Sequence, residues 1–152
     1  MPNVFNLLAG ELRNEHERDG WRTRSTRVAS EIGGSEIGGS VYDIPAGEHT
    51  FPYHYHHGVE EWLVVIDGTP EVRTPEGTRA LRPGDVMCFP AGEAGAHTVA
   101  GPGRILMLSN ADSPTTVAVY PDSDKLGTRP QFAGDRLDFR RSDAVDYWEG
   151  ER

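Results

Sequence analysis

The sequence has few of the features that mark membrane proteins, nucleic-acid-binding proteins or disulfide-linked proteins. No apolar stretch approaches the roughly 20 residues that a membrane-spanning helix needs. The 152-residue chain has a formal net charge of −9. It contains no Lys/Arg block longer than two residues, which argues against binding to a phosphate backbone. A single cysteine, Cys88, excludes an internal disulfide and suits a reducing compartment.

The N-terminus lacks a basic region followed by a long apolar run, so the sequence predicts no secretory signal. We therefore expect one cytoplasmic domain with no membrane or nucleic-acid partner. Cys88 alternates out of phase with Met87 and Phe89, and we expect it to be a small buried residue.

Short strands and explicit turns dominate the sequence between residues 24 and 120. The 18 glycines and 11 prolines fit a chain of many short strands joined by tight turns. About eight or nine strands can be placed at short spacing in this region. This pattern predicts an all-β sandwich or barrel.

The segments on either side of this region differ from it. Residues 1–24 form an N-terminal segment in which a short amphipathic helix is expected, because apolar residues recur at helical spacing at Val4, Leu7, Leu8 and Leu12. The barrel is assigned to residues 25–120, with an edge strand over residues 24–29 and a glycine-rich turn over residues 31–40. Residues 121–152 form an acidic C-terminal extension with several large apolar side chains, so we expect it to pack on the barrel or on a partner subunit.

The chain is organised around a histidine-rich stretch between Gly47 and Gly68. His54 and His56 are two residues apart in a predicted strand, so their side chains project from the same face. A following strand that begins near Glu61 can bring its carboxylate back against the two rings. Imidazole with carboxylate is a ligand set that suits first-row transition metals.

The spacing of these residues resembles the motifs of the cupin superfamily. The first motif matches at Gly47, His54, His56, Glu61 and Gly68, with one extra residue after Gly47. The second matches at Gly84, Pro90, Gly92 and His97, although four residues separate Gly92 from His97 where two are usual. The stretches YPDSDK and YWEG resemble those of small bacterial single-domain cupins. The resemblance implies a double-stranded β-helix, the jelly-roll barrel of cupins.

The resemblance also implies one divalent transition metal per chain, held by His54, His56, Glu61 and His97. Fe, Mn, Ni, Co, Cu and Zn all accept this ligand set, so the identity of the metal does not follow. Glu60 is an alternative to Glu61, but the spacing to Gly68 favours Glu61. Because protonated imidazole cannot ligate, we expect metal binding to weaken as the pH falls through about 6.5.

The strands that carry these ligands also predict the wall of a pocket. The inward-facing residues expected there are Leu63, Val65 and Val99, with Tyr42, Met87 and Phe89 as further members. This lining is largely apolar, and no cluster of arginines is placed in the sequence to hold a phosphate. Trp62, Val64 and Ile66 alternate with the inward set and are equally apolar, so either the N- and C-terminal segments or another subunit should cover them. The resemblance to single-domain cupins, which commonly dimerise through this sheet, favours a homodimer.

Three imidazoles and one carboxylate leave one or two positions open on the metal, as in catalytic or ligand-binding centres. The resemblance favours a metal-dependent enzyme that acts on a small organic molecule, with dioxygenase-like oxidoreductase chemistry as the first choice. A metal-dependent isomerase or lyase is close behind. A cupin that binds a sugar or metabolite without turnover is the alternative from another class.

Overall fold

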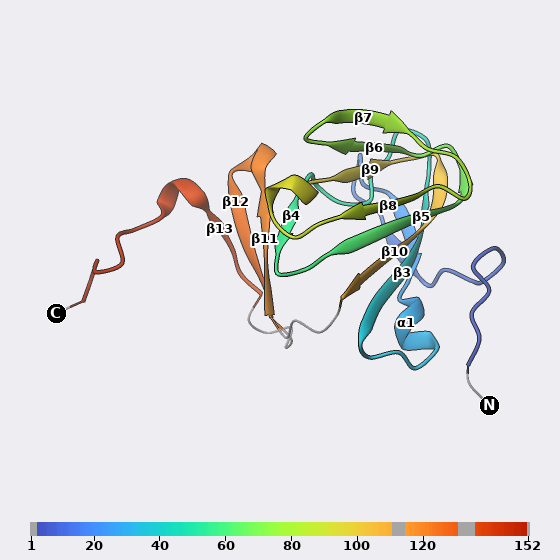
Figure 1. Ribbon diagram of the computed structural model, residues 1–152, viewed down its shortest axis with the longest axis horizontal. Coiled ribbons are helices and arrows are strands. Elements are labelled where there is room, and N and C mark those ends of the chain that lie inside the picture. Colours follow the sequence, from blue (N-terminus) through green and yellow to red (C-terminus); the bar gives the residue numbers. More distant parts are fainter. Residues whose placement is uncertain (1–2, 111–114, 131–135, 152) are drawn as a thin grey trace.

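The computed structural model describes residues 3–110, 115–130 and 136–151, and nearly all of its regular elements are antiparallel strands (Figure 1). The strands are β1 (Asn14–His16), β2 (Thr23–Thr26), β3 (Ile37–Ile44), β4 (Tyr55–His57), β5 (Glu61–Gly68), β6 (Glu71–Thr74), β7 (Gly77–Ala80), β8 (Val86–Phe89), β9 (Thr98–Ala100), β10 (Gly103–Asn110), β11 (Thr115–Tyr120), β12 (Lys125–Pro130) and β13 (Asp138–Arg140). The helices are short: α1 (Val28–Glu31), η1 (Glu93–Gly95), η2 (Pro121–Ser123) and η4 (Arg141–Asp143). No helix in these ranges is long and apolar enough to cross a membrane.

The strands form three sheets. The largest has the order β1-β2-β3-β10-β5-β8, and the other two have the orders β13-β12-β11-β4 and β7-β6-β9. Most neighbours in space are distant in sequence, since β10 pairs with both β3 and β5 while β4 pairs with β11. Such non-local antiparallel pairing is typical of a jelly roll, so the predicted fold class is confirmed.

The main core is an apolar cluster contributed by the six-stranded sheet and the β7-β6-β9 sheet. Its fully buried members include Leu63, Val65, Val72 and Ile105, and Tyr42 and Met87 pack against it. A second cluster of Leu12, Val28 and Val41 covers part of the opposite face of β3. The larger sheet is therefore packed on both faces near β3 and β10.

The predicted helix over residues 4–12 does not form, and the helix near the N-terminus is α1 instead. The side chain of Asn6 accepts hydrogen bonds from the backbone amides of Leu8 and Ala9, which closes a turn in place of a helix. Leu12 then packs beside Val28 and Val41. The apolar residues of this segment therefore serve tertiary packing and not a helical face.

Three smaller expectations also change. The edge strand expected over residues 24–29 is β2, which ends at Thr26 before α1 begins. Only the first part of the glycine-rich segment is a turn, because β3 already begins at Ile37. Cys88 is exposed and not buried, and β8 lies at the edge of its sheet.

The glycines that flank the histidine-rich stretch provide a stability test. Both have a left-handed backbone, with φ of +79° at Gly47 and +81° at Gly68. A Cβ on Gly68 would lie 2.7 Å from the Cα of Gly103 and from the carbonyl oxygen of Pro102, whereas no atom lies within 4 Å at Gly47.

We expect Gly47→Ala to lower the free energy of unfolding by about 1–2 kcal/mol, the cost of the left-handed backbone. Gly68→Ala should cost clearly more, because the backbone before β10 must also shift. Urea denaturation of the two variants measures the difference. Equal losses of unfolding free energy in the two variants would show that the close contacts of Gly68 with Pro102 and Gly103 do not add to the cost of the substitution.

Candidate metal centre

The centre is assembled by a backbone bridge between two segments that are far apart in sequence. The amide of His54 donates to the carbonyl of His97 at 3.0 Å, and the amide of His97 donates to the carbonyl of His54 at 2.8 Å. His56 follows in β4, and Glu61 is the first residue of β5. The bridge thus brings the second motif histidine to the first motif.

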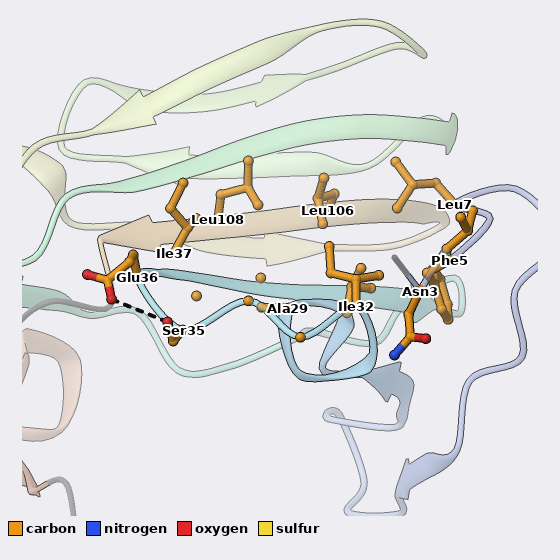
Figure 2. A pocket seen from close by; sticks show the side chains of 16 residues that line it. Asn3, Phe5, Leu7, Ala29, Ile32, Ser35, Glu36, Ile37, Leu106 and Leu108 are labelled. Atoms are coloured by element: carbon orange, nitrogen blue, oxygen red, sulfur yellow. Dashed lines mark hydrogen bonds between the residues drawn. The ribbon is translucent and has the colours of Figure 1, made fainter. Parts of the chain in front are cut away.

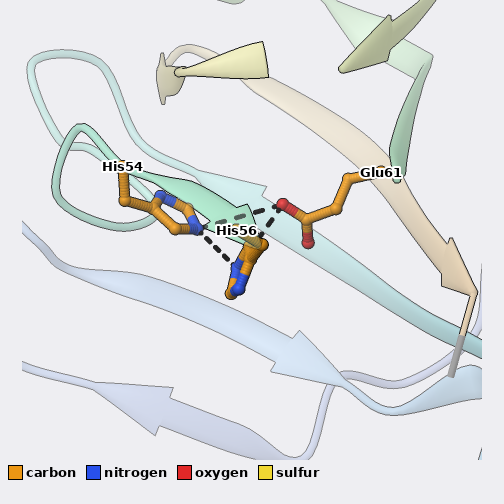
Figure 3. A group of neighbouring side chains, drawn as sticks. All are labelled: His54, His56 and Glu61. Carbon is orange, nitrogen blue, oxygen red and sulfur yellow. Dashed lines mark hydrogen bonds and ion pairs between the residues drawn. The ribbon is translucent and has the colours of Figure 1, made fainter. Parts of the chain in front are cut away.

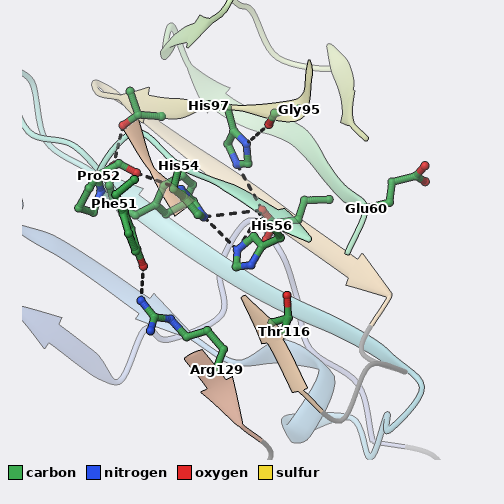
Figure 4. Close-up of polar contacts among 12 residues, drawn as sticks. Phe51, Pro52, His54, His56, Glu60, Gly95, His97, Thr116 and Arg129 are labelled. Carbon is green, nitrogen blue, oxygen red and sulfur yellow. Dashed lines mark hydrogen bonds and ion pairs between the residues drawn. The ribbon is translucent and has the colours of Figure 1, made fainter. Parts of the chain in front are cut away.

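The side chains of His54, His56 and Glu61 point toward one another (Figure 3), and the ring of His97 lies beside them (Figure 4). The Nε2 atoms of His54 and His56 are 3.1 Å apart. Oε2 of Glu61 lies 3.5 Å from Nε2 of His97, 3.7 Å from that of His56 and 3.9 Å from that of His54. Two ligands held at about 2.0–2.2 Å from one ion are themselves separated by about 3–3.5 Å. The donor atoms of His54, His56 and Glu61 all lie within 4.8 Å of one another and could hold one metal ion, and Nε2 of His97 lies beside them at the Glu61 carboxylate.

Backbone carbonyls orient two of the imidazoles for ligation. Nδ1 of His54 lies 2.9 Å from the carbonyl oxygen of Pro52, and Nδ1 of His97 lies 2.9 Å from that of Gly95. A proton held on Nδ1 by these contacts leaves the lone pair of each Nε2 free for the cluster. Nε2 of His97 is buried and has no hydrogen-bond partner in the part of the chain that the structure describes. A bound cation would satisfy this nitrogen, so the residues fit a metal.

Burial controls the protonation of the cluster. It lowers the pKa of His54, His56 and His97 to about 4, with smaller contributions from neighbouring imidazoles. It raises the pKa of Glu61 to about 7. The three histidines are consequently neutral, and ready to act as ligands, across the physiological pH range.

Solvent reaches the cluster from one side. The side chains of Glu61 and His56 are 19% and 15% exposed, whereas that of His97 is 1% exposed. Phe89 stacks on the ring of His97 at 3.8 Å between centroids, and Phe51 meets the rings of His54 and His97 edge-on. A ligand therefore has access at His56 and Glu61, while aromatic rings close the opposite side.

Most of the expected pocket lining lies in the packed core beside this cluster. Leu63, Val65, Val99 and Phe89 are at most 3% exposed. Tyr42 and Met87 are partly buried and pack against the same core. Glu60 lies outside the cluster and accepts a hydrogen bond from the indole of Trp62 at 2.7 Å, so the structure favours Glu61 as the carboxylate.

Three residues near the centre were missed by the sequence analysis: Phe51, Tyr120 and Arg129. Tyr120 stacks on His54 with 5.7 Å between ring centroids, and Arg129 donates a hydrogen bond to its phenol oxygen. Arg129 also helps to lower the pKa of His54 and His56. The alternation of β11 could have shown that Tyr120 shares a face with Ala118. Only the pairing with β4 shows that this is the face of His56.

Comparison with known proteins agrees with this geometry. A family model described as a cupin domain matches residues 40–109. The solved structure of a cupin-superfamily sugar phosphate isomerase from Silicibacter pomeroyi DSS-3 has a TM-score of 0.78 and 22% identity over 96% of this chain and 98% of its own. A provisionally assigned sugar phosphate isomerase from Acidithiobacillus ferrooxidans ATCC 23270 has a TM-score of 0.74 and 23% identity, covering 84% of this chain and 81% of its own. A cupin-like protein from Thermotoga maritima has a TM-score of 0.54 and 19% identity, covering 67% and 80%.

No curated protein matches the chain. The family model, the jelly-roll topology and the two histidine motifs agree, so the chain contains a cupin domain over residues 40–109. At these identities the solved structures establish the fold alone. The function must be argued from the residues of the site.

Ligand replacement tests the assignment directly. We expect His56→Ala to lose most of the metal that the wild-type protein binds, because an incomplete ligand set holds the ion weakly. His57→Ala is the matched control, since His57 is exposed and adjacent in the sequence. Elemental analysis of proteins purified without a metal-affinity tag measures the content. Equal metal in wild type and His56→Ala would refute the assignment.

The pH dependence of metal uptake should follow Glu61 and not the histidines. Below pH 7 an incoming ion must displace a proton from Glu61, whose pKa is about 7, whereas the imidazoles with pKa near 4 stay neutral. We expect metal affinity to fall about tenfold per pH unit from pH 7 down to about pH 5. This differs from the expectation of a transition near 6.5 caused by histidine protonation.

Competition with a chromophoric chelator between pH 5 and 8 measures this dependence. Glu61→Gln should bind the metal more weakly and with a flatter pH profile over the same range. An unchanged slope in Glu61→Gln would assign the titration to the histidines instead.

Proposed function

We propose that the protein is a metal-dependent cupin enzyme that acts on a small organic molecule, with His54, His56, Glu61 and His97 as the metal ligands. One observation carries the proposal. Three imidazole nitrogens lie within 3.9 Å of one carboxylate oxygen, and the side chains of His56 and Glu61 remain partly exposed to solvent. A structural metal site would normally be closed on all sides by protein ligands.

The surrounding residues prepare this site for chemistry. A divalent ion bound there would polarise an oxygen atom of the substrate as a Lewis acid. Phe51 and Phe89 exclude water from the buried side, which strengthens electrostatic interactions at the donor atoms. Arg129 fixes the phenol of Tyr120 beside His54, where it can orient a bound molecule by hydrogen bonding.

Two reaction classes are compatible with this arrangement. The first is dioxygen-dependent cleavage, and the second is isomerisation or elimination of a metabolite that carries a carbonyl or hydroxyl group. The similarity in fold to a sugar phosphate isomerase supports including phosphorylated keto sugars among the test compounds. Capture of a sugar or metabolite without turnover is the non-catalytic alternative.

Reconstitution distinguishes these possibilities. The metal-free protein would be loaded separately with Fe(II), Mn(II), Co(II), Ni(II), Cu(II) or Zn(II). Oxygen uptake and product formation would then be measured with catechols, diketones, thiols, keto sugars and their phosphates. We expect turnover with at least one metal and its loss in His56→Ala, with His57→Ala unaffected. Tight binding of one unmodified compound without turnover by any metal form would place the protein in the binding class.

An apolar groove on the outer face of β3 and β10 supports a further proposal, that two chains associate (Figure 2). The groove has a volume of about 740 Å³ and is lined by residues that include Ile32, Ile37 and Leu108. Ile37 and Leu108 also border a neighbouring hollow that contains Trp62. Ile32, Ile37 and Trp62 are 43%, 61% and 44% exposed. Ile66, in contrast, already packs against the cluster of Leu12, Val28 and Val41.

We propose that a second copy of the chain covers this face, because the exposed apolar surface is continuous from the groove to Trp62. The C-terminal extension offers further apolar contacts. Its Phe139, Tyr147 and Trp148 are 49%, 83% and 70% exposed, and the segment projects away from the barrel (Figure 1). We propose that it packs on the partner subunit.

Trp62→Glu is expected to shift the protein from dimer to monomer, because burying each large apolar side chain contributes about 1.5–3 kcal/mol. Thr78→Glu on the exposed strand β7 is the control for added charge. Sedimentation velocity at micromolar concentration measures the oligomeric state. A monomeric wild-type protein under these conditions would contradict the proposal.

A further inference from the structure

A second ligand-sized site lies beside the metal cluster. It has a volume of about 520 Å³, which is within the range of small-molecule pockets. We call it the basic cleft. The residues that line it come from four separate segments: His16, Arg18, Trp21, Thr50, Phe51, Pro52, Tyr53, Asp122, Ser123, Lys125 and Arg136.

The charge of the basic cleft is opposite to that of the protein, whose formal net charge is −9. Arg18, Lys125 and Arg136 contribute three cations to the lining. Asp122 is the one carboxylate in this lining, and two hydrogen bonds pair it with Arg73. The cleft therefore combines an excess of positive charge with the rings of aromatic residues.

Lys125 is connected to the metal cluster through Tyr120. It is the only lysine in the sequence. Its Nζ lies 5.3 Å from the ring centroid of Tyr120, and Tyr120 stacks on His54. Strand register agrees, because Lys125 pairs with Tyr120 and His56 pairs with Ala118, two residues before Tyr120 on the same face. One aromatic ring thus separates the lysine from a metal ligand.

A second aromatic ring, that of Phe51, also lies between the basic cleft and the metal cluster. Phe51 lines the basic cleft, and the same ring lies 4.9 Å from the ring of His54 and 5.3 Å from that of His97, measured between centroids. The cleft and the metal cluster therefore share Phe51 as a common boundary. A molecule of a few carbon atoms held at Lys125 is long enough to pass Tyr120 and reach the open side of the cluster at His56 and Glu61.

Lys125 is not needed to hold the side chain of Tyr120 in place. Arg129 already donates a hydrogen bond to the phenol oxygen of Tyr120 and places its guanidinium carbon 5.6 Å from the ring centroid. Asp138 lies 3.3 Å from this guanidinium and balances its charge. Among the described residues, Lys125 has no carboxylate within ion-pair distance. A second cation here repels the first unless an anion joins them.

We propose that the basic cleft binds the anionic group, a phosphate or a carboxylate, of the small molecule on which the metal centre acts. This inference rests on the proposed function of that centre. Lys125 is the main anchor, and Arg18 and Arg136 add charge at the rim. The substrate class is thus a small anion with a second oxygen group that can reach the metal.

The single lysine allows a direct measurement of binding. Reductive methylation with ¹³C-formaldehyde labels Lys125 and the N-terminal amine only, and it preserves the positive charge. We expect fructose 6-phosphate and gluconate to shift the NMR signal of dimethylated Lys125 in a saturable manner, with uncharged fructose at least tenfold weaker. Added salt should weaken the binding of both anions, because the contacting groups are partly exposed.

Variants separate the cleft from the metal centre. Lys125→Gln should lower the affinity of the metal-loaded protein for fructose 6-phosphate by about tenfold in calorimetry, the effect of losing one charge-assisted contact. Its metal content should be unchanged. Arg79→Gln is the matched control, because it removes one exposed cation on β7 that does not line the cleft. His56→Ala should lose the metal and still show the Lys125 shift, so failure at the metal centre is distinguishable from failure at the cleft.

A cobalt-loaded protein tests whether the same molecule occupies both sites. Fructose 6-phosphate should change the visible absorption of the bound Co(II), and Lys125→Gln should require about tenfold more ligand for the same change. Equal binding of fructose and fructose 6-phosphate, or equal affinity of Lys125→Gln and wild type, would overturn the proposal. Saturation of Lys125 without any change at cobalt would overturn the link between the cleft and the metal centre.

Discussion

The pair of backbone hydrogen bonds between His54 and His97 is the interaction on which the site depends. It joins two segments that enter the barrel from different sheets, and it places two imidazoles side by side before any metal binds. Burial disfavours the charged forms of these groups, so it lowers the pKa of His54 and His97 and raises that of Glu61. A bound cation would stabilise the charged carboxylate of Glu61, and it would accept the lone pair of the unpaired Nε2 of His97.

Local pattern was sufficient to predict much of the centre from the sequence. His54 and His56 share a face because strand side chains alternate, and the spacing from Glu61 to Gly68 selected the carboxylate over Glu60. The resemblance to the cupin motifs then supplied His97, which no local rule could connect to the others. The jelly roll followed from the same two motifs, and the strand pairings confirm it.

The remaining features depend on tertiary packing that a single sequence does not show. Helical spacing in residues 4–12 is overridden because Asn6 closes a turn and Leu12 packs onto β3. Cys88 alternates as a buried residue should, but it is exposed and its strand lies at a sheet edge. In both cases the periodic pattern is present in the sequence. The prediction fails because the neighbour that decides the structure or the burial is remote in sequence.

The basic cleft shows the same limit at a functional level. Its cations stand singly, at Arg18, Lys125 and Arg136, so the sequence offered no cluster that could hold a phosphate. Folding gathers them in a cleft that Phe51 also lines, and it places Lys125 beside Tyr120; both rings also contact His54. Since like charges gain nothing from proximity, their assembly in an acidic protein requires a compensating partner. Asp122 is occupied by Arg73, and Asp138 is shared by Arg129 and Arg136, which leaves an external anion as the simplest partner of Lys125.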